Sequence, residues 1–303
     1  MPPTMDCSEI SQNNPALSAR SAVSGAPKRS SITMTSPSLP LFAQGLALQV
    51  GRALARRFEA ARNHPRRKAD HTLVTDADLE ADERLTRALE AAFPGVPVLS
   101  EERATVLPDT PEAWVIDPLD GTTNFALGLP MWGVLLAFLE GGQPTVAVAY
   151  FPVMDEVYLA VRGQGATRNG ETIHTRGVDT AHETAFALVC SRSLQRYRLD
   201  WPWKLRILGS AGYEMALVAR GVAIAALEST PKVWDLAAPT LLVTEAGGHW
   251  GVLEGASPFP LRPGVDYRKA DFPMLAAASL PLWEALRAGV HARNASERQK
   301  HSP

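Results

Sequence analysis

Apolar residues recur at helical spacing from Leu41 to Phe58, which predicts an amphipathic helix. The series stops at the Asn63-His64-Pro65 segment, because proline ends a helix. Thr75 then stands three residues before Asp78, the spacing of a capping box, and a second apolar series follows. The pattern therefore predicts two consecutive helices, the second beginning directly after Thr75.

The next part of the chain changes to short apolar runs that are separated by turn residues, a pattern typical of β-strands. Five strands are expected here, at Val96 to Ser100, Trp114 to Asp117, Trp132 to Leu139, Thr145 to Phe151 and Val157 to Val161. Beyond Gly170, apolar runs of strand length alternate with helical patterns, which favours an α/β organisation. These segments are Ala185 to Cys190, Leu205 to Leu208, Tyr213 to Arg220, Val222 to Leu227 and Ala237 to Ala246.

The pattern divides the chain into four parts. Residues 1–38 are rich in Ser and Pro and lack an amphipathic period, so we expect a disordered leader. An α+β half is expected over residues 39–176, an α/β half over residues 177–293, and a frayed tail over residues 294–303.

Composition excludes several classes of protein. With 303 residues, 46% of them hydrophobic, and a formal net charge of -2, the chain lacks the basic excess of a nucleic-acid-binding protein. Its only cysteines, Cys7 and Cys190, cannot form a disulfide framework or a zinc cluster, which favours a cytoplasmic location. The longest apolar runs are too short to span a membrane.

Candidate chemistry lies in four short acidic segments, most of which follow an apolar run and therefore stand where strands end. They are Ser100-Glu101-Glu102, the stretch from Asp117 to Phe125, the stretch from Glu228 to Asp235, and the Thr75/Asp78 pair. In the second segment, Pro118 turns the chain between two aspartates, and Gly121-Thr122 opens a short helix whose free N–H groups attract an anion.

Each segment also has a purely structural interpretation. Adjacent glutamates at a strand end are usually a solvated pair, and a Pro-Leu-Asp-Gly sequence is an ordinary turn. Asp235 would serve as the N-cap of a helix that ends at Gly247. The four segments together are stronger evidence for a functional site than any one of them.

In order and spacing these segments resemble the inositol monophosphatase family, within the superfamily of magnesium-dependent, lithium-sensitive phosphatases that includes fructose 1,6-bisphosphatase. The resemblance extends from about Leu41 to Ala288. The matching residues are Leu73-Val74-Thr75 with Asp78, Glu101-Glu102, Asp117-Pro118-Leu119-Asp120-Gly121-Thr122-Thr123-Asn124-Phe125, Gly209-Ser210-Ala211, and Trp234-Asp235-Leu236-Ala237-Ala238 running to Glu245-Ala246-Gly247-Gly248. It implies a layered αβαβα sandwich and a homodimer.

The resemblance also implies a cluster of two to three Mg²⁺ ions. Glu101, Asp117 and the carbonyl of Leu119 would hold the first ion, and Asp117, Asp120 and Asp235 the second, with Glu101 also at a weaker third. Magnesium prefers carboxylate and carbonyl oxygens, so a site without a histidine or cysteine cluster fits this metal.

Catalytic roles are implied in the same way. Glu101 and the hydroxyl of Thr122 would orient the attacking water, while Asp78 holds that hydroxyl and helps to accept the proton. The N–H groups of Gly121 and Thr122 would bind a phosphate oxygen.

The remaining substrate contacts implied by the resemblance are Ala211 through its backbone, Glu228 through the hydroxyls of a polyol, and Asp120 and Asp235 beside the metals.

Three hypotheses about function remain open. The first is hydrolysis of myo-inositol monophosphate or a similar polyol phosphate, which Thr123-Asn124-Phe125 and Glu228 favour. The second keeps the metal site but takes histidinol phosphate, fructose 1,6-bisphosphate or 3′-phosphoadenosine 5′-phosphate. The third is a non-catalytic binding protein, whose signature would be a missing metal ligand. Two departures from the family, Ile224 and Leu227, suggest an altered pocket wall, and Lys68 matches a basic residue of the family only loosely.

Overall fold

The computed structural model describes residues 38–63, 75–175 and 184–294. The predicted tail from residue 295, the leader up to residue 37, the boundary at residues 176 and 177, and Lys68 lie outside these ranges. The α-helices of the described ranges are α1 (Leu39–Asn63), α2 (Thr75–Ala92), α3 (Thr122–Leu127), α4 (Ser191–Arg196), α5 (Ala211–Ala219), α6 (Val233–Glu245) and α7 (Leu280–Ala288). Short 3₁₀ turns occur at η1 (Pro152–Met154) and η2 (Tyr267–Lys269).

The strands form two principal sheets. The larger sheet has the order β1-β2-β3-β4-β5-β6-β7, in which only β1 and β2 pair in parallel. Its strands are β1 (Val98–Ser100), β2 (Glu112–Asp120), β3 (Gly133–Glu140), β4 (Gln143–Phe151), β5 (Glu156–Val161), β6 (Gly165–Arg168) and β7 (Glu171–Ile173).

The smaller sheet has the order β10-β8-β11-β13-β12 and is mixed, since β10, β8 and β11 are parallel while β13 opposes both of its neighbours. Its strands are β8 (Phe186–Val189), β10 (Lys204–Arg206), β11 (Ala225–Glu228), β12 (His249–Val252) and β13 (Met274–Ala277). A separate short pair joins β9 (Tyr197–Leu199) to β14 (Val290–Ala292).

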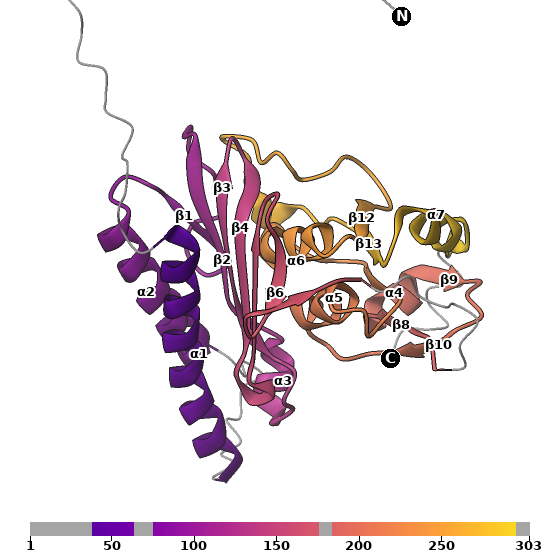
Figure 1. Cartoon of the computed structure of the whole chain (residues 1–303), viewed down its shortest axis with the longest axis horizontal. Coiled ribbons are helices and arrows are strands. Elements are labelled where there is room, and N and C mark those ends of the chain that lie inside the picture. The colour runs from indigo at the N-terminus through magenta and orange to yellow at the C-terminus, as the bar shows by residue number, and fades with distance from the viewer. Residues whose placement is uncertain (1–37, 64–74, 176–183, 295–303) are drawn as a thin grey trace, which may run out of the picture. The chain divides into compact units, whose positions relative to one another are not determined.

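The elements stack as five alternating layers (Figure 1). Helices α1 and α2 cover the outer face of the larger sheet, α5 and α6 lie between the two sheets, and α4 and α7 cover the far face of the smaller sheet. Three clusters of buried apolar side chains close the interfaces between layers, and one of them extends from the larger sheet through α5 and α6 to the smaller sheet. Burying such clusters is the main favourable term in folding.

The amphipathic pattern of α1 accounts for its place in this arrangement. One face of the helix is buried against the larger sheet, and its apolar residues there are Ala43, Leu46, Ala47, Val50, Leu54 and Phe58. The basic residues Arg52, Arg56 and Arg57 lie on the opposite, exposed face. The predicted first helix is therefore confirmed, and so is the start of the second, since α2 begins at Thr75.

The five strands predicted for the first half coincide with β1 to β5. The short strands β6, β7 and β12 were not predicted, because their sequences lack the apolar run that marks short strands such as β1 and β8. The predicted strand from Val222 was wrong at its start. Residues 222–224 connect α5 to β11, and pairing with β8 begins only at Ala225.

Within the described ranges, none of the helices combines the length and the apolar character that crossing a bilayer requires.

Candidate metal and phosphate site

Two acidic segments meet at one edge of the larger sheet because β1 and β2 run in parallel. Ser100 at the end of β1 pairs with Ile116 of β2, so Glu101 leaves β1 beside Asp117, which continues in β2. The carboxyl ends of adjacent parallel strands are where α/β proteins commonly place their sites. The pairing thus explains how residues distant in the sequence share one location.

A β-bulge in β2 turns Asp117 and Asp120 to the same side. Asp117 pairs with Leu135 of β3 and Asp120 pairs with Gly133, so two residues, Pro118 and Leu119, oppose a single partner residue. In a regular strand, residues three apart point to opposite faces. The extra residue cancels that alternation, and the proline favours it because it cannot donate to the ladder.

The third aspartate comes from the other half of the chain. Asp235 lies in the first turn of α6, where its Oδ2 accepts the backbone N–H of Lys232 at 2.7 Å. The expectation that Asp235 is the N-cap was wrong, because Lys232 occupies that position. Asp235 stands three residues further on, and this reciprocal bond to the N-cap backbone aims its carboxylate at β2.

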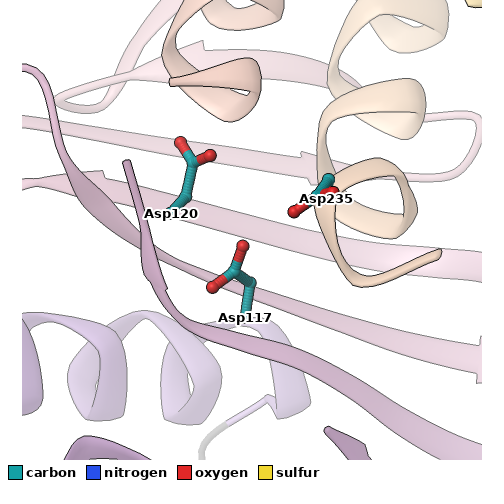
Figure 2. Close-up of side chains that lie close together, drawn as sticks. All are labelled: Asp117, Asp120 and Asp235. Atoms are coloured by element: carbon teal, nitrogen blue, oxygen red, sulfur yellow. The ribbon is translucent and has the colours of Figure 1, made fainter. Parts of the chain in front are cut away.

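Figure 2 shows the three aspartates converging from β2 and the start of α6. One carboxylate oxygen from each of Asp117, Asp120 and Asp235 lies within 4.8 Å of the others. Asp117 and Asp120 are buried. Burial raises the pKa of Asp117 well above its usual range, and the charges of Asp235 and Asp120 raise it further.

Such a cluster is unfavourable without a cation. Burial and the neighbouring carboxylates raise the pKa of Asp235 to about 7, although the backbone N–H of Lys232 opposes the shift. Three converging carboxylates are the hard oxygen donors that Mg²⁺ prefers, and a divalent cation would relieve their repulsion. The donor set therefore fits the magnesium cluster that the sequence suggests.

The start of helix α5 packs against Asp120 and donates hydrogen bonds to its carboxylate. The hydroxyl of Ser210, the N-cap of α5, donates to Asp120 Oδ2, as does the N–H of Gly212 at 3.1 Å. Burial raises the pKa of Asp120 to about 6, and these donors reduce the shift. A Cβ on Gly212 would lie 2.8 Å from Asp120 Oδ2 and 2.9 Å from Leu135, so only glycine allows the helix to approach so closely.

Glu101 and Asp78 stand around this cluster. Glu101 is exposed and lies outside the close group of three carboxylates, yet its charge raises the pKa of both Asp117 and Asp235. Asp78 of α2 is buried, and this burial together with the charges of Glu102 and Glu101 raises its pKa to about 8. The predicted acidic residues thus share one electrostatic environment.

The structure gives the hydroxyl of Thr122 a different acceptor from the expected Asp78. It donates to the carbonyl oxygen of Leu119 at 2.9 Å, the same oxygen suggested as a metal ligand. Thr122 is the first residue of α3, and Gly121 before it has a φ of 80°, a conformation that favours glycine. The turn therefore places Leu119, Gly121 and Thr122 next to the aspartates, as predicted from the Asp-Pro-Leu-Asp-Gly-Thr sequence.

A pocket of about 350 Å³ opens beside the aspartates. It brings together three of the predicted substrate contacts, Ala211, Glu228 and Asp235. Its complete lining is Thr123, Asn124, Cys190, Ser191, Arg192, Gly209, Ser210, Ala211, Glu228, Thr230, Pro231 and Asp235. A pocket lined mainly by polar groups suits a hydroxylated ligand.

Glu228 at the end of β11 is 7% exposed and borders this pocket. Burial raises its pKa well above the usual range, and the neighbouring Glu214 and Cys190 raise it further. Glu214 was not predicted, although it is fully buried and accepts the N–H groups of Leu208 at 2.8 Å and Gly209 at 3.1 Å. Nothing local in the sequence distinguishes it from a surface acid on α5.

The expectation of an altered pocket wall at Ile224 and Leu227 was wrong. Both side chains are buried in the cluster between the smaller sheet and α7, and neither belongs to the pocket lining. In β11 the side chains alternate between the two faces, so Glu228 faces away from Leu227.

Comparison with known proteins agrees with this geometry. A model of the inositol monophosphatase family matches residues 38–279. The chain is 34% identical over 226 residues to an inositol-1-monophosphatase of Mesorhizobium japonicum, covering 69% of this chain and 83% of that protein. It is 35% identical over 203 residues to a histidinol-phosphatase of Mycobacterium tuberculosis, covering 63% and 78%. It is 33% identical over 238 residues to the Nus factor SuhB of Xylella fastidiosa, covering 74% and 83%.

Solved structures agree as well. The extragenic suppressor protein suhB of Bartonella henselae superposes with a TM-score of 0.67 at 26% identity, over 82% of this chain and 96% of that one. An inositol monophosphatase from Anabaena superposes with a TM-score of 0.64 at 25% identity, over 83% and 94%. The fold and the acidic site are those of a metal-dependent phosphomonoesterase. The chain belongs to the inositol monophosphatase family, and the predicted αβαβα sandwich is confirmed.

Proposed function

We propose that this protein hydrolyses myo-inositol monophosphate, or a closely similar polyol phosphate, to the alcohol and inorganic phosphate in a Mg²⁺-dependent reaction. The observation that carries the proposal is the convergence of Asp117, Asp120 and Asp235 beside a polar pocket that Glu228 borders. The carboxylates suit a magnesium-bound phosphate, and Glu228 suits the hydroxyls of a leaving group.

Glu101, Asp117, the Leu119 carbonyl, Asp120 and Asp235 are the proposed ligands of two to three ions. When bound, Mg²⁺ supplies Lewis-acid stabilisation of the charge on the phosphoryl oxygens and lowers the pKa of the attacking water.

The protein groups would then position the reactants. The Thr122 hydroxyl donates to Leu119, so its oxygen is left to accept a hydrogen bond from the attacking water, which Glu101 also orients. Asp78 is the proposed proton acceptor, with its raised pKa suited to that role. The N–H groups of Gly121 and Thr122 would hold a phosphate oxygen, and Ala211 and Glu228 the leaving group.

The proposal is tested by measuring phosphate release from four substrates with Mg²⁺ and with excess chelator. These are myo-inositol 1-phosphate, histidinol phosphate, fructose 1,6-bisphosphate and 3′-phosphoadenosine 5′-phosphate. We expect the highest kcat/KM with inositol phosphate, no turnover in chelator, and inhibition by lithium at millimolar concentration. Undiminished turnover in chelator would contradict the metal-dependent mechanism.

Histidinol phosphate is the second candidate substrate. The observation in its favour is the 35% identity to the Mycobacterium tuberculosis histidinol-phosphatase, similar to the identity with the inositol-1-monophosphatase. A deprotonated Glu228 would also suit a cationic leaving group. A non-catalytic role has weaker support, because no proposed acidic metal ligand is missing.

Glu228→Gln separates the polyol contact from the metal site. If the carboxylate accepts hydrogen bonds from hydroxyls, the substitution should lower kcat/KM for inositol phosphate about 5- to 150-fold, or about 1–3 kcal/mol. Turnover of p-nitrophenyl phosphate should scarcely change, because its leaving group has no hydroxyl. Equal losses with both substrates would instead assign Glu228 to the support of the metals or the fold.

Two further features belong to this proposal through family membership alone. A cytoplasmic location and a homodimer are both expected, and the mass of the protein in solution tests the second.

A further inference from the structure

The proposed mechanism leaves one contact near the metal site without a role. The guanidinium of Arg268 donates to the backbone carbonyl of Glu101 at 3.1 Å, across 167 residues of sequence. Arg268 lies in η2, which is remote in sequence from both halves of the aspartate cluster. The bond therefore ties the exposed segment that bears Glu101 to a distant part of the fold.

The segment around η2 is itself anchored on the Glu101 side. The N–H of Tyr267 donates to the carbonyl of Thr105 at 2.8 Å, and the Thr105 hydroxyl donates to Asp266 at 2.7 Å. Asp266 also pairs with Val106 in an isolated β-bridge and accepts the N–H of Arg268 at 3.2 Å. These contacts fix the backbone of Arg268, and its side chain extends from there to Glu101.

The same segment is joined to α6 on the other side. The Lys232 ammonium donates to the carbonyl of Arg268 at 2.8 Å and forms an ion pair with Asp271 at 2.8 Å. The backbone N–H of Lys232 is the group that orients Asp235. Glu101, Arg268, Lys232 and Asp235 therefore form a continuous chain of contacts between two segments that bear proposed metal ligands.

We propose that Arg268 and Lys232 are positioning residues that hold the Glu101 segment against the start of α6 and thereby set the Mg²⁺ affinity of the site. The inference rests on the proposed role of Glu101 as a metal ligand. Neither residue is among the proposed metal ligands or in the lining of the pocket. They act by fixing the position of Glu101 relative to Asp235, because groups that orient a ligand strongly affect metal affinity.

The test compares Arg268→Ala with Arg268→Lys, and Lys232→Met with Lys232→Arg. Lys269→Ala is the control, because Lys269 is a neighbouring, exposed cation that forms an ion pair with Asp266. Lys232→Met keeps the backbone donor to Asp235, since that donor is the main-chain N–H. Mg²⁺ binding is measured by calorimetry without substrate, and thermal melting in chelator verifies the fold of each variant.

Arg268→Ala and Lys232→Met should each raise the Mg²⁺ dissociation constant about 3- to 10-fold. At saturating Mg²⁺ the value of kcat should return to within about 2-fold of the parent. The conservative variants should recover most of the affinity, and Lys269→Ala should bind as the parent does. Unchanged Mg²⁺ affinity in both Arg268→Ala and Lys232→Met would overturn the proposal.

A double-mutant cycle distinguishes action through Glu101 from a general loss of structure. In a Glu101→Gln background, Arg268→Ala should have little further effect on Mg²⁺ affinity. Additive effects would overturn the proposal, as would a Glu101→Gln variant that binds Mg²⁺ like the parent. If no substrate is hydrolysed but the binding cycle shows coupling, the proposed function fails and the positioning role stands.

Discussion

Asp117→Asn is expected to lower kcat by about 10³-fold or more while the protein remains folded. The change removes a carboxylate from the three that converge on the proposed metal site, and metal-ion stabilisation of a phosphoryl transition state contributes several kcal/mol. Folding should persist because Asp117 Oδ1 accepts the N–H of Leu119 at 3.0 Å, and an asparagine oxygen can accept the same bond.

The same variant should melt at a higher temperature than the parent in chelator, because asparagine needs neither a buried charge beside Asp235 and Asp120 nor the uptake of a proton to neutralise it. Added Mg²⁺ should stabilise the parent far more than the variant. Paired melting and turnover measurements check both effects, with the exposed Asp109→Asn as the control for the chemical change. A variant with parental turnover would remove Asp117 from the metal site.

The free energy of unfolding of the metal-free protein is expected to fall as the pH rises from about 4 to about 7. The folded-state pKa values of Asp120 and Asp235 are about 6 and about 7, both above the ordinary value of 3.8. A raised carboxyl pKa means that the folded state binds more protons than the unfolded state. The stabilisation is therefore complete below the unfolded pKa and is lost as the pH rises through the folded one, by about 1.4 kcal/mol per pH unit for each group.

Mg²⁺ should reverse this dependence, because the cation binds the deprotonated carboxylates and competes with protons. Melting temperatures at pH 5, 6, 7 and 8, with chelator and with Mg²⁺, provide the measurement. Asp117→Asn in chelator serves as the comparison and should show a shallower slope, since one repelling charge is absent. A parent that becomes more stable in chelator between pH 5 and pH 8 would contradict the expected repulsion within the cluster.

The local sequence pattern was sufficient to predict the elements that are long or have a distinctive apolar period. The helical spacing from Leu41 to Phe58 and the five apolar runs of the first half each correspond to an element of the structure. These predictions succeed because the period of a helix face or a buried strand is repeated over many residues. The short strands β6, β7 and β12 were not predicted, since their pairing depends on partners that the segment itself does not specify.

The Asp-Pro-Leu-Asp-Gly-Thr stretch shows how much of the site's geometry can be predicted from the sequence. Proline between two aspartates already argues against a regular strand, and the structure places a bulge there. Only the pairing with Leu135 and Gly133 turns Asp117 and Asp120 to one side. The acceptor of the Thr122 hydroxyl likewise depends on that local turn, which is why Leu119 replaced the expected Asp78.

By itself, the sequence determined which residues can take part in the chemistry, because carboxylates at the ends of apolar runs and a glycine before a short helix are local properties of the chain. The tertiary structure alone decided which of them meet. Asp117 and Asp235 are separated by 118 positions, and they converge because α6 packs across β2 from between the sheets. The partners Glu214 and Arg268 also depended on that packing. Each of these two residues contacts the site only through the packing of separate segments. No pattern within either segment predicts those contacts.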